Sequence, residues 1–472
     1  MVQAGPAVPR SSPGSLPARI AGQVLAIGLA VLPAAAAETA PAAQVLPSPV
    51  VAVRCGRLID GVSDRPLQGA TVLIEAGRVI RTGRGIAIPA GARVHDLSEY
   101  TCLPGFIDCH THLMDGYDMS ATEVEALRRS AADMAFRSIR NARRTIEAGF
   151  TTVRDVGTYH AFTDVALRDA IDRGDVVGPR MQVAGFYVTI PGGGGELNSF
   201  APEIDLPAHL RFGVVTGEEE MRRVVREAIG HRVDLIKIIA SGAFLAIGNV
   251  PQAPAFTEAE IRVAAREASK AGLRVAAHAH SAISIVEAAR AGAASIEHGV
   301  YIDGDGIRTM LRKGTYLVPD LYDGIFIETQ GRALGWPEEY VRKQEESRAV
   351  WPATIRRAYE AGVRIAFGTD SAVYPHGDNG KQFVLMQEWL GMSPMQAIRS
   401  ATVTAAALMG WEDRVGSLTA GRYGDLVAVR GNPLDDLRLL ESIPFVMKGG
   451  LVIKDLRSGE TPAGVDSGGG GG

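Results

Sequence analysis

The sequence predicts an α/β protein in which a (β/α)8 barrel of the TIM type is joined to a small discontinuous β-sandwich domain. Two observations lead to this prediction. Apolar strands alternate with amphipathic helices from residue 101 onward, and segments of β character both precede and follow that region. A chain of 472 residues is long enough for one large domain and a smaller companion.

The amino-terminal segment has the composition of a secretory signal peptide. Arg10 and Arg19 precede an apolar run from Ile20 to Leu32, and small residues follow it. A membrane anchor and a misassigned start codon are the alternatives, but the run is shorter than the ~20 residues that span a bilayer. We therefore expect a signal peptide over 1–37, a Pro/Ala-rich linker over 38–49, and a secreted or periplasmic protein without stable membrane insertion.

Segments of β character on both sides of the barrel predict the smaller domain. Ala70–Ile74 and Arg78–Thr82 form an expected hairpin around Ala76 and Gly77. The other expected strands of this domain are Val50–Asp60, Arg93–Leu97, Asp425–Arg430 and Pro444–Lys454. We expect the β-sandwich to comprise residues 50–103 and 413–458, formed by the N- and C-terminal segments together, and residues 459–472 to form a flexible Gly-rich tail.

The barrel is expected over residues 104–412, with strands and helices in alternation. Its strands are Thr101–Asp108, Thr151–Asp155, Arg180–Tyr187, Leu235–Ala240, Arg274–His278, Ala294–His298, Thr315–Pro319 and Arg364–Gly368. Several of the intervening helices end in glycine, the residue that favours the left-handed conformation of a helix C-terminus; these are Gly149, Gly272, Gly292 and Gly362. An open doubly wound sheet is the alternative, but no Gly-rich dinucleotide-binding motif follows the first strand.

The chain contains three cysteines, Cys55, Cys102 and Cys109. Because an odd number does not suggest a disulfide framework, we expect the core alone to stabilise the fold. Cys109 lies beside His110 and could be taken for a metal ligand. Alternation along a strand turns it to the opposite face, so we interpret it as a packing residue.

Four histidines and one aspartate lie at the expected C-terminal ends of barrel strands. His110 and His112 follow the first strand with a spacing that places both imidazoles on one face. His278 ends the fifth strand, His298 the sixth and Asp370 the eighth. A barrel of this type builds its active site from these ends. Any single member could be a satisfied core residue, but the set of nitrogen and oxygen atoms favours zinc or another divalent first-row metal.

Lys237 lies inside an otherwise apolar strand. A buried ammonium is costly unless it is paired or neutralised. One interpretation is a lysine that reaches a carboxylate at the barrel rim; the other follows from a resemblance to known proteins.

Together these motifs resemble the amidohydrolase superfamily: H-x-H after strand one, a lysine in strand four, histidines ending strands five and six, and an aspartate ending strand eight. The likeness covers nearly the whole mature chain. It is closest to the imidazolonepropionase-related branch of metal-dependent carboxypeptidases, prolidase-like dipeptidases and ochratoxin-type amidases. Further matches are His278-Ala279-His280, Ile296-Glu297-His298-Gly299 and the segment Tyr374–Asn379.

The resemblance implies two divalent metal ions, expected to be Zn²⁺, and a carboxylated Lys237 that bridges them. His110, His112 and Asp370 would bind one ion, and His278 and His298 the other. Relatives often carry Gly-Gly-His-Gly-Asp after strand three, whereas this chain has Pro-Gly-Gly-Gly-Gly-Glu at 191–196. The resemblance therefore does not extend to that histidine near the substrate.

For catalysis, two close metal ions activate a water molecule and polarise the substrate carbonyl. We expect Asp370 to take a proton from this water and pass it to the leaving nitrogen, and His280 or Tyr322 to stabilise the oxyanion. His280 could instead orient a metal ligand. The expected substrate contacts are His280, Tyr322, His376, Tyr187 and His160; Arg154, Arg180 and Lys381 could bind a substrate carboxylate, and His95, His209 and His231 are expected to be surface or structural residues.

The expected reaction is hydrolysis of an amide bond, releasing a C-terminal amino acid from a dipeptide or an N-acyl amino acid. The same metals also serve the hydrolysis of cyclic amides, lactones or phosphotriesters. A non-catalytic interaction protein is a further alternative, which the filled set of ligand positions disfavours. The expected partner is a small-molecule amide. A net charge of −4 without a basic cluster excludes nucleic acid, and we expect a homo-oligomer.

Overall fold

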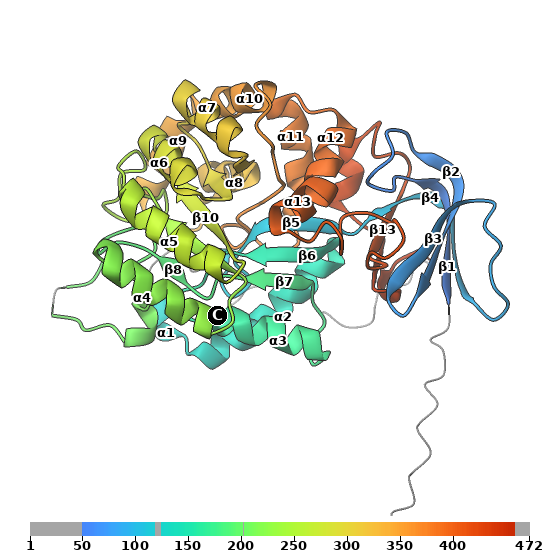
Figure 1. Ribbon diagram of the computed structural model, residues 1–472, viewed down its shortest axis with the longest axis horizontal. Helices are drawn as coiled ribbons and strands as arrows, with labels where there is room; N and C mark the ends of the chain where they lie inside the picture. The colour runs from blue at the N-terminus through green and yellow to red at the C-terminus, as the bar shows by residue number, and fades with distance from the viewer. Residues whose placement is uncertain (1–49, 119–123, 202, 458–472) are drawn as a thin grey trace, which may run out of the picture. The chain divides into compact units, whose positions relative to one another are not determined.

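The computed structural model describes residues 50–118, 124–201 and 203–457 (Figure 1). The expected signal peptide, linker and C-terminal tail lie outside the described residues. No described helix is long and apolar enough to span a membrane.

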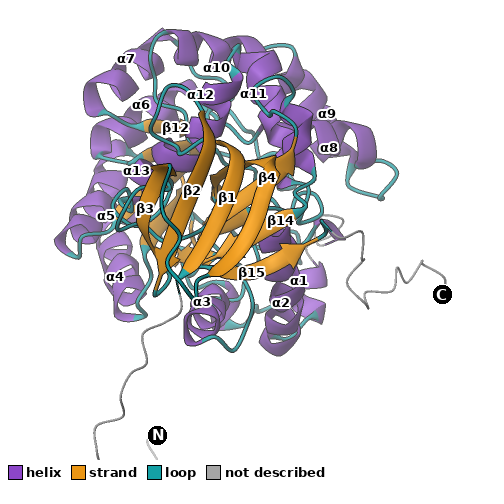
Figure 2. Cartoon of the chain, turned by 90° about the vertical axis from the view of Figure 1, so that its right-hand side faces the viewer, coloured by secondary structure: helices purple, strands orange, loops and turns teal. Residues whose placement is uncertain are grey.

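The N- and C-terminal segments share one seven-stranded sheet (Figure 2). Its strands are β1 (Val51–Leu58), β2 (Leu67–Glu75), β3 (Arg78–Arg84), β4 (Arg93–Pro104), β13 (Leu426–Arg430), β14 (Phe445–Lys448) and β15 (Leu451–Asp455), in the order β15-β14-β13-β4-β1-β2-β3. β1 and β4 are parallel, and the other neighbours are antiparallel. The pairing of β13 with β4 joins residues from opposite ends of the chain, as the sequence predicted.

The described residues of this domain form a single sheet, whereas we expected a β-sandwich. The alternation of β13 gives the reason. Leu426 and Ala428 pack with the other apolar residues of the sheet, while Val427 and Val429 pack into the main core cluster of the larger region. Since the larger region covers the second apolar face of β13, no second sheet is needed to bury it.

A disulfide joins Cys55 in β1 to Cys102 in β4, and our prediction that the chain has no disulfide was wrong. The parallel pairing of these two strands brings together cysteines that are 47 residues apart in sequence. Cys109 remains free and fully buried, as expected of a packing residue.

The β2–β3 hairpin turns at Ala76 and Gly77, which both have positive φ, 47° and 77°. Two successive left-handed residues are typical of a tight turn whose twist matches that of the flanking strands. The hairpin was predicted at this position.

The larger region contains parallel strands that alternate with helices. The strands are β5 (Phe106–Thr111), β6 (Phe150–Asp155), β7 (Arg180–Val183), β8 (Tyr187–Val188), β9 (Leu235–Ile239), β10 (Arg274–Ala279), β11 (Ser295–His298) and β12 (Tyr316–Val318). They form a three-stranded sheet, β5-β6-β7, and a five-stranded sheet, β12-β11-β10-β9-β8. β7 and β8 correspond to one expected strand, interrupted after Val183, so that its first part pairs with β6 and its second part with β9.

The expected eighth strand, Arg364–Gly368, is not a regular strand, although the segment lies where that strand was predicted. Ile365 forms an isolated parallel bridge with Leu317 of β12. On the other side, the Cys109 amide of β5 donates to the Phe367 carbonyl at 2.8 Å. This segment therefore connects the free edges of the two sheets and completes a circuit of paired segments.

Helices cover the outer side of these strands (Figure 1). They are α1 (Val124–Arg128), α2 (Ala131–Glu147), α3 (Thr163–Arg173), α4 (Gly217–Gly230), α5 (Glu258–Lys270), α6 (Ala282–Ala291), α7 (Gly304–Lys313), α8 (Leu321–Gln330), α9 (Glu338–Arg348), α10 (Trp351–Glu360), α11 (Gln382–Leu390), α12 (Pro394–Arg399) and α13 (Ala405–Met409). α2 and α5 begin with capping boxes at Ser130 and Thr257, which satisfy backbone amides of the first turn. The four predicted helix-terminal glycines all have positive φ, between 72° and 110°.

Candidate metal centre

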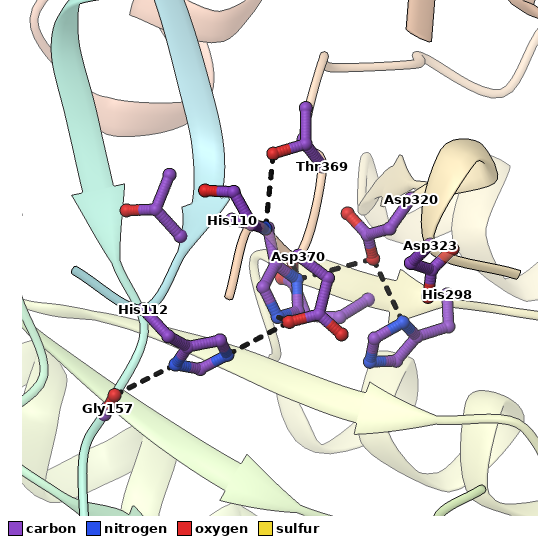
Figure 3. A network of polar contacts seen from close by, with 12 residues as sticks. His110, His112, Gly157, His298, Asp320, Asp323, Thr369 and Asp370 are labelled. Atoms are coloured by element: carbon purple, nitrogen blue, oxygen red, sulfur yellow. Dashed lines mark hydrogen bonds and ion pairs between the residues drawn. The ribbon is translucent and has the colours of Figure 1, made fainter. Parts of the chain in front are cut away.

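The predicted ligands meet at the C-terminal ends of the strands, in a cavity of about 170 Å³. His110 lies in β5, with His112 just after it; Lys237 lies in β9, His278 in β10 and His298 at the end of β11. Asp370 follows the irregular eighth segment. All six side chains line the cavity, so the strand ends bring together residues as far apart in sequence as His110 and Asp370 (Figure 3).

His110 and His112 are each oriented by a hydrogen bond through Nδ1. His110 donates to Glu297 Oε2 at 3.0 Å, and His112 donates to the Gly157 carbonyl at 2.8 Å. This leaves both Nε2 atoms facing Asp370. Asp370 Oδ1 lies 3.5 Å from His110 Nε2 and 3.1 Å from His112 Nε2. Anchoring one imidazole nitrogen while the other faces a shared point is the usual arrangement of metal-binding histidines.

Electrostatics couple Asp370 to these two rings. Burial alone would raise the pKa of Asp370, but the neighbouring His110 and His112 hold it below its usual value. Burial lowers the pKa of His112, but the Asp370 carboxylate outweighs this effect and raises it to about 9. A proton on His112 thus supplies the positive charge that Asp370 needs, and a divalent cation between the two groups would replace that proton.

His278 and His298 form the second half of the site. Their ring centroids lie 4.5 Å apart. His278 donates from Nε2 to the Gly242 carbonyl at 3.2 Å, which leaves Nδ1 as its metal-binding nitrogen. His298 is held through Nδ1, 2.9 Å from Asp320 Oδ2, which leaves Nε2.

Lys237 lies in the same cavity, beside His110. It is 2% exposed, and its Nζ lies 3.4 Å from His110 Nε2. No carboxylate of the described residues forms an ion pair with Lys237, so the structure does not show the salt bridge to a rim carboxylate that the sequence left open. Burial lowers its pKa, despite the opposing effect of nearby carboxylates. A lowered pKa favours the neutral amine.

Several buried acids surround the ligands, and sequence reasoning missed them. Asp320 lies 2.9 Å from His298 and 3.4 Å from His110, and Asp323 can share a cation with His298 and Asp370. Burial raises the pKa of Asp320 and Asp323 well above the usual value. Such a concentration of buried carboxylates fits a site built for cations. The signal for Asp320 was available: it directly follows the seventh strand.

Glu297 connects the site to the interior of the larger region. Both its oxygens accept hydrogen bonds from Arg154 Nη2 at 2.9 Å, Ser295 also donates to it, and its Oε2 accepts from His110. Glu297 is fully buried and Arg154 is 3% exposed. The glutamate therefore neutralises a buried arginine and positions a ligand at the same time.

The backbone is strained at two of the ligands. His298 and Asp370 have φ values of 68° and 52°, in the left-handed region that residues with a side chain rarely adopt. Asp370 is held there by its amide, which donates to the His110 carbonyl at 2.9 Å. Strain of this kind is retained where the surrounding structure enforces it, and it is concentrated at functional sites.

Of the expected substrate contacts, His280 and Tyr187 line the cavity. His280 stacks on His298, with ring centroids 4.8 Å apart, and its buried Nδ1 has no hydrogen-bond partner within the described part of the chain. The Tyr187 hydroxyl lies 3.0 Å from His112 Nδ1. Both are therefore placed where they can contact a substrate.

The other three expected contacts do not line this cavity. His160 donates to the Ala126 carbonyl at 3.0 Å, and His376 donates to the Asp115 carbonyl at 3.1 Å, so both hold loops in place. Tyr322 packs against Tyr374 and accepts a hydrogen bond from Lys381. The structure therefore gives these three predictions no support: the rings of His160 and His376 bind backbone carbonyls, and Tyr322 lies in helix α8.

The basic residues considered for a substrate carboxylate are also placed elsewhere. Arg154 is paired with Glu297, Arg180 with Asp425 and Lys381 with Asp378. None of the three lines the cavity. Of the remaining histidines, His231 stacks on Phe162, which agrees with a structural role.

The donor set as a whole fits divalent metal ions. The ligand atoms of His110, His112 and Asp370 lie within 4.8 Å of one another, as do those of His278, His280 and His298. Neutral imidazole and carboxylate are ligands that zinc and similar metals prefer. A metal there would act as a Lewis acid on a carbonyl or on water.

Comparisons with known proteins agree with this geometry. The sequence profile of the amidohydrolase family matches residues 101–461. Ochratoxinase from Aspergillus niger is 28% identical over 425 residues, covering 86% of this chain and 87% of that protein. Its crystal structure superposes with a TM-score of 0.77.

Two further solved structures are similar. A Xaa-Pro dipeptidase with methionine bound in its active site is 36% identical, with a TM-score of 0.80, and the match covers 85% of this chain and 99% of that one. A prolidase complexed with N-methylphosphonate-L-proline is 29% identical, with a TM-score of 0.78, over 86% of this chain and 100% of that one. The chain therefore belongs to the amidohydrolase family and is a hydrolase that acts on amide carbon–nitrogen bonds.

Proposed function

We propose that this hydrolase uses two divalent metal ions, expected to be Zn²⁺. His110, His112 and Asp370 would hold one ion, and His278 and His298 the other. The observation that carries the proposal is the convergence of these side chains in one buried cavity, each histidine with a ring nitrogen left for a metal.

We propose further that Lys237 carries a carboxylate and bridges the ions. Its neutral amine would add to CO₂ and lose a proton, which turns the neutral side chain into an anion with two oxygens. The lowered pKa of Lys237 and its position beside His110 support this modification. An unmodified amine offers a single nitrogen and is a poor bridging ligand.

The chain's own residues would then complete the reaction. When bound, the metals supply Lewis-acid activation of water and of the scissile carbonyl. Asp370, held ionised by His110 and His112, would accept the proton of the attacking water and deliver it to the leaving nitrogen. His280, whose Nδ1 has no other partner, would donate to the oxygen on which negative charge develops.

The proposed reaction releases the C-terminal amino acid of a dipeptide or an N-acyl amino acid. Likeness to a dipeptidase, a prolidase and an ochratoxinase supports this substrate class. The cavity supports it as well, because apolar side chains such as Phe244, Leu245 and Val373 line it beside the candidate ligands. Most ligand pockets combine an apolar wall with a few polar groups in this way.

The test is hydrolysis of a panel of dipeptides and N-acyl amino acids by the mature protein, with zinc and with a chelator. We expect release of a free amino acid that the chelator abolishes and added zinc restores, with about two metal ions bound per chain. Metal binding without release from any member would reject dipeptides and N-acyl amino acids as the substrate class and favour a cyclic amide, a lactone or a phosphotriester. Release that is insensitive to the chelator would reject the metal mechanism.

We propose a (β/α)8 barrel for the larger region and export for the whole chain. The circuit of paired segments β5 to β12, completed through Ile365 and Phe367, supports the barrel. The Cys55–Cys102 disulfide supports an oxidising location, which agrees with the signal peptide expected from the sequence.

A further inference from the structure

The cavity wall beyond the metal ligands is apolar and acidic. Among the described residues that line it, Lys237 is the one Lys or Arg, whereas Asp115, Asp323 and Asp370 supply three carboxylates. Residues 119–123 and 202, which the structure does not describe, also include no Lys or Arg. A substrate group that enters this cavity therefore meets more negative than positive side chains.

Asp115 is a buried acid of this wall with one unpaired oxygen. It is 7% exposed, its Oδ2 accepts a long hydrogen bond from the Tyr187 hydroxyl at 3.5 Å, and its Oδ1 has no hydrogen-bond partner among the described residues. The nearby Arg137 is bonded to Asp118 instead. Burying a carboxylate oxygen without a partner is costly, so the unpaired Oδ1 of a residue that lines the cavity indicates a missing partner.

The loop holds Asp115 firmly in this position. Its backbone carbonyl accepts hydrogen bonds from Asn141 at 2.9 Å and from His376 at 3.1 Å. Its amide donates to the His112 carbonyl at 3.0 Å. Asp323 differs, because its Oδ1 already accepts from the Gly324 amide at 2.6 Å and it can share a cation with His298 and Asp370.

The position of Asp115 suits the amino end of a peptide. The Tyr187 hydroxyl lies between Asp115 and His112, so the carboxylate is one side chain away from a proposed metal ligand. In a dipeptide, the α-nitrogen is two bonds from the scissile carbonyl carbon. A carbonyl at the metal centre would therefore place its α-ammonium against the neighbouring wall.

We propose that Asp115 binds the α-ammonium group of the substrate, so that the enzyme prefers dipeptides with a free amino terminus to N-acyl amino acids. This inference rests on the proposed amide hydrolase function. It selects between the two substrate types that the function leaves open, since only the dipeptide carries a cation at this point. An acyl group would leave the buried carboxylate unpaired.

The experiment compares two substrates that differ only in this group: L-Phe-L-Leu and 3-phenylpropanoyl-L-leucine, which lacks the amine. Both are assayed with the zinc-loaded wild-type enzyme, Asp115→Asn and Asp305→Asn. We expect wild type to prefer the dipeptide at least about tenfold in kcat/KM, and Asp115→Asn to lower this ratio about tenfold to hundredfold, mainly through KM. Asp305, an exposed carboxylate of α7 that is paired with Arg308 and does not line the cavity, is the control, and its variant should keep the wild-type ratio.

Three results would overturn the inference, and they are distinguishable. A wild-type enzyme that cleaves the des-amino substrate as well as the dipeptide refutes ammonium recognition but leaves the amide hydrolase intact. An Asp115→Asn variant that slows both substrates equally, with less zinc bound, assigns the residue a structural role. If zinc binds but neither substrate is cleaved, the proposed function itself fails.

Discussion

Replacement of Glu297 by Gln tests whether one buried carboxylate supports both the fold and the metal centre. The substitution keeps the shape of the side chain but removes its charge. Arg154, 3% exposed, then loses its only acidic partner among the described residues. Its remaining hydrogen bonds go to the Cys109 carbonyl at 2.6 Å and to Ser295 at 2.9 Å, which are neutral groups.

Removing one partner of a buried ion pair costs about 3–5 kcal/mol. Because the glutamine oxygen can still accept one hydrogen bond from Arg154, we expect the lower end, about 3 kcal/mol in the free energy of unfolding. The second effect concerns His110, whose Nδ1 donates to Glu297 at 3.0 Å. Loss of such an orienting partner weakens metal binding about 10–100-fold.

The assay combines urea unfolding of the metal-free protein with zinc titration against a competing chelator. Glu267→Gln is the matched control. Glu267 pairs with Arg222, Arg226 and Lys270 between the outer helices α4 and α5, remote from the cavity, so its loss should leave zinc affinity unchanged. The reasoning is refuted if Glu297→Gln unfolds within about 1 kcal/mol of wild type and binds zinc as tightly.

Three further predictions address the ligands and the sheet. Lys237→Ala should abolish activity and sharply reduce the metal bound per chain, measured by elemental analysis; a variant that keeps both would exclude a bridging carbamate. Asp370→Asn should keep the fold but lower kcat about 10²–10⁴-fold if the carboxylate transfers the proton, and a near-normal rate would contradict that role. Replacing Cys55 and Cys102 with Ser should lower the free energy of unfolding by about 4 kcal/mol, since the cross-link closes a loop with a sequence separation of 47. Urea unfolding with and without reductant measures this loss. An unchanged midpoint would mean that the disulfide does not stabilise the sheet.

The convergence of the candidate ligands could be predicted from sequence because strands have a simple periodicity. A spacing of two places His110 and His112 on one face, and parallel strands all present their C-terminal ends to the same side. His278, His298 and Asp370 each end an apolar run, so their convergence followed from counting strands. The residues that orient these ligands, such as Asp320 and Glu297, were missed because their roles depend on distances between strands.

Loops and long-range contacts account for most of the errors. His160 and His376 follow strands in sequence, but their loops turn the rings toward backbone carbonyls. The disulfide was missed because nothing local indicates that Cys55 and Cys102 belong to neighbouring parallel strands. The eighth segment was located correctly, yet it makes only an isolated bridge to β12, and periodicity reveals neither this nor the φ of 52° at Asp370.

The pairing of β4 with β13 has a consequence for the order of folding. The Thr101 hydroxyl donates to the Gly431 carbonyl, 330 residues later in the chain. During synthesis, one edge of β4 has no partner until nearly the entire polypeptide is available, and contacts of such sequence separation form slowly. An unpaired apolar strand edge is prone to aggregation, so premature termination before Leu426 would leave a polypeptide that associates with itself.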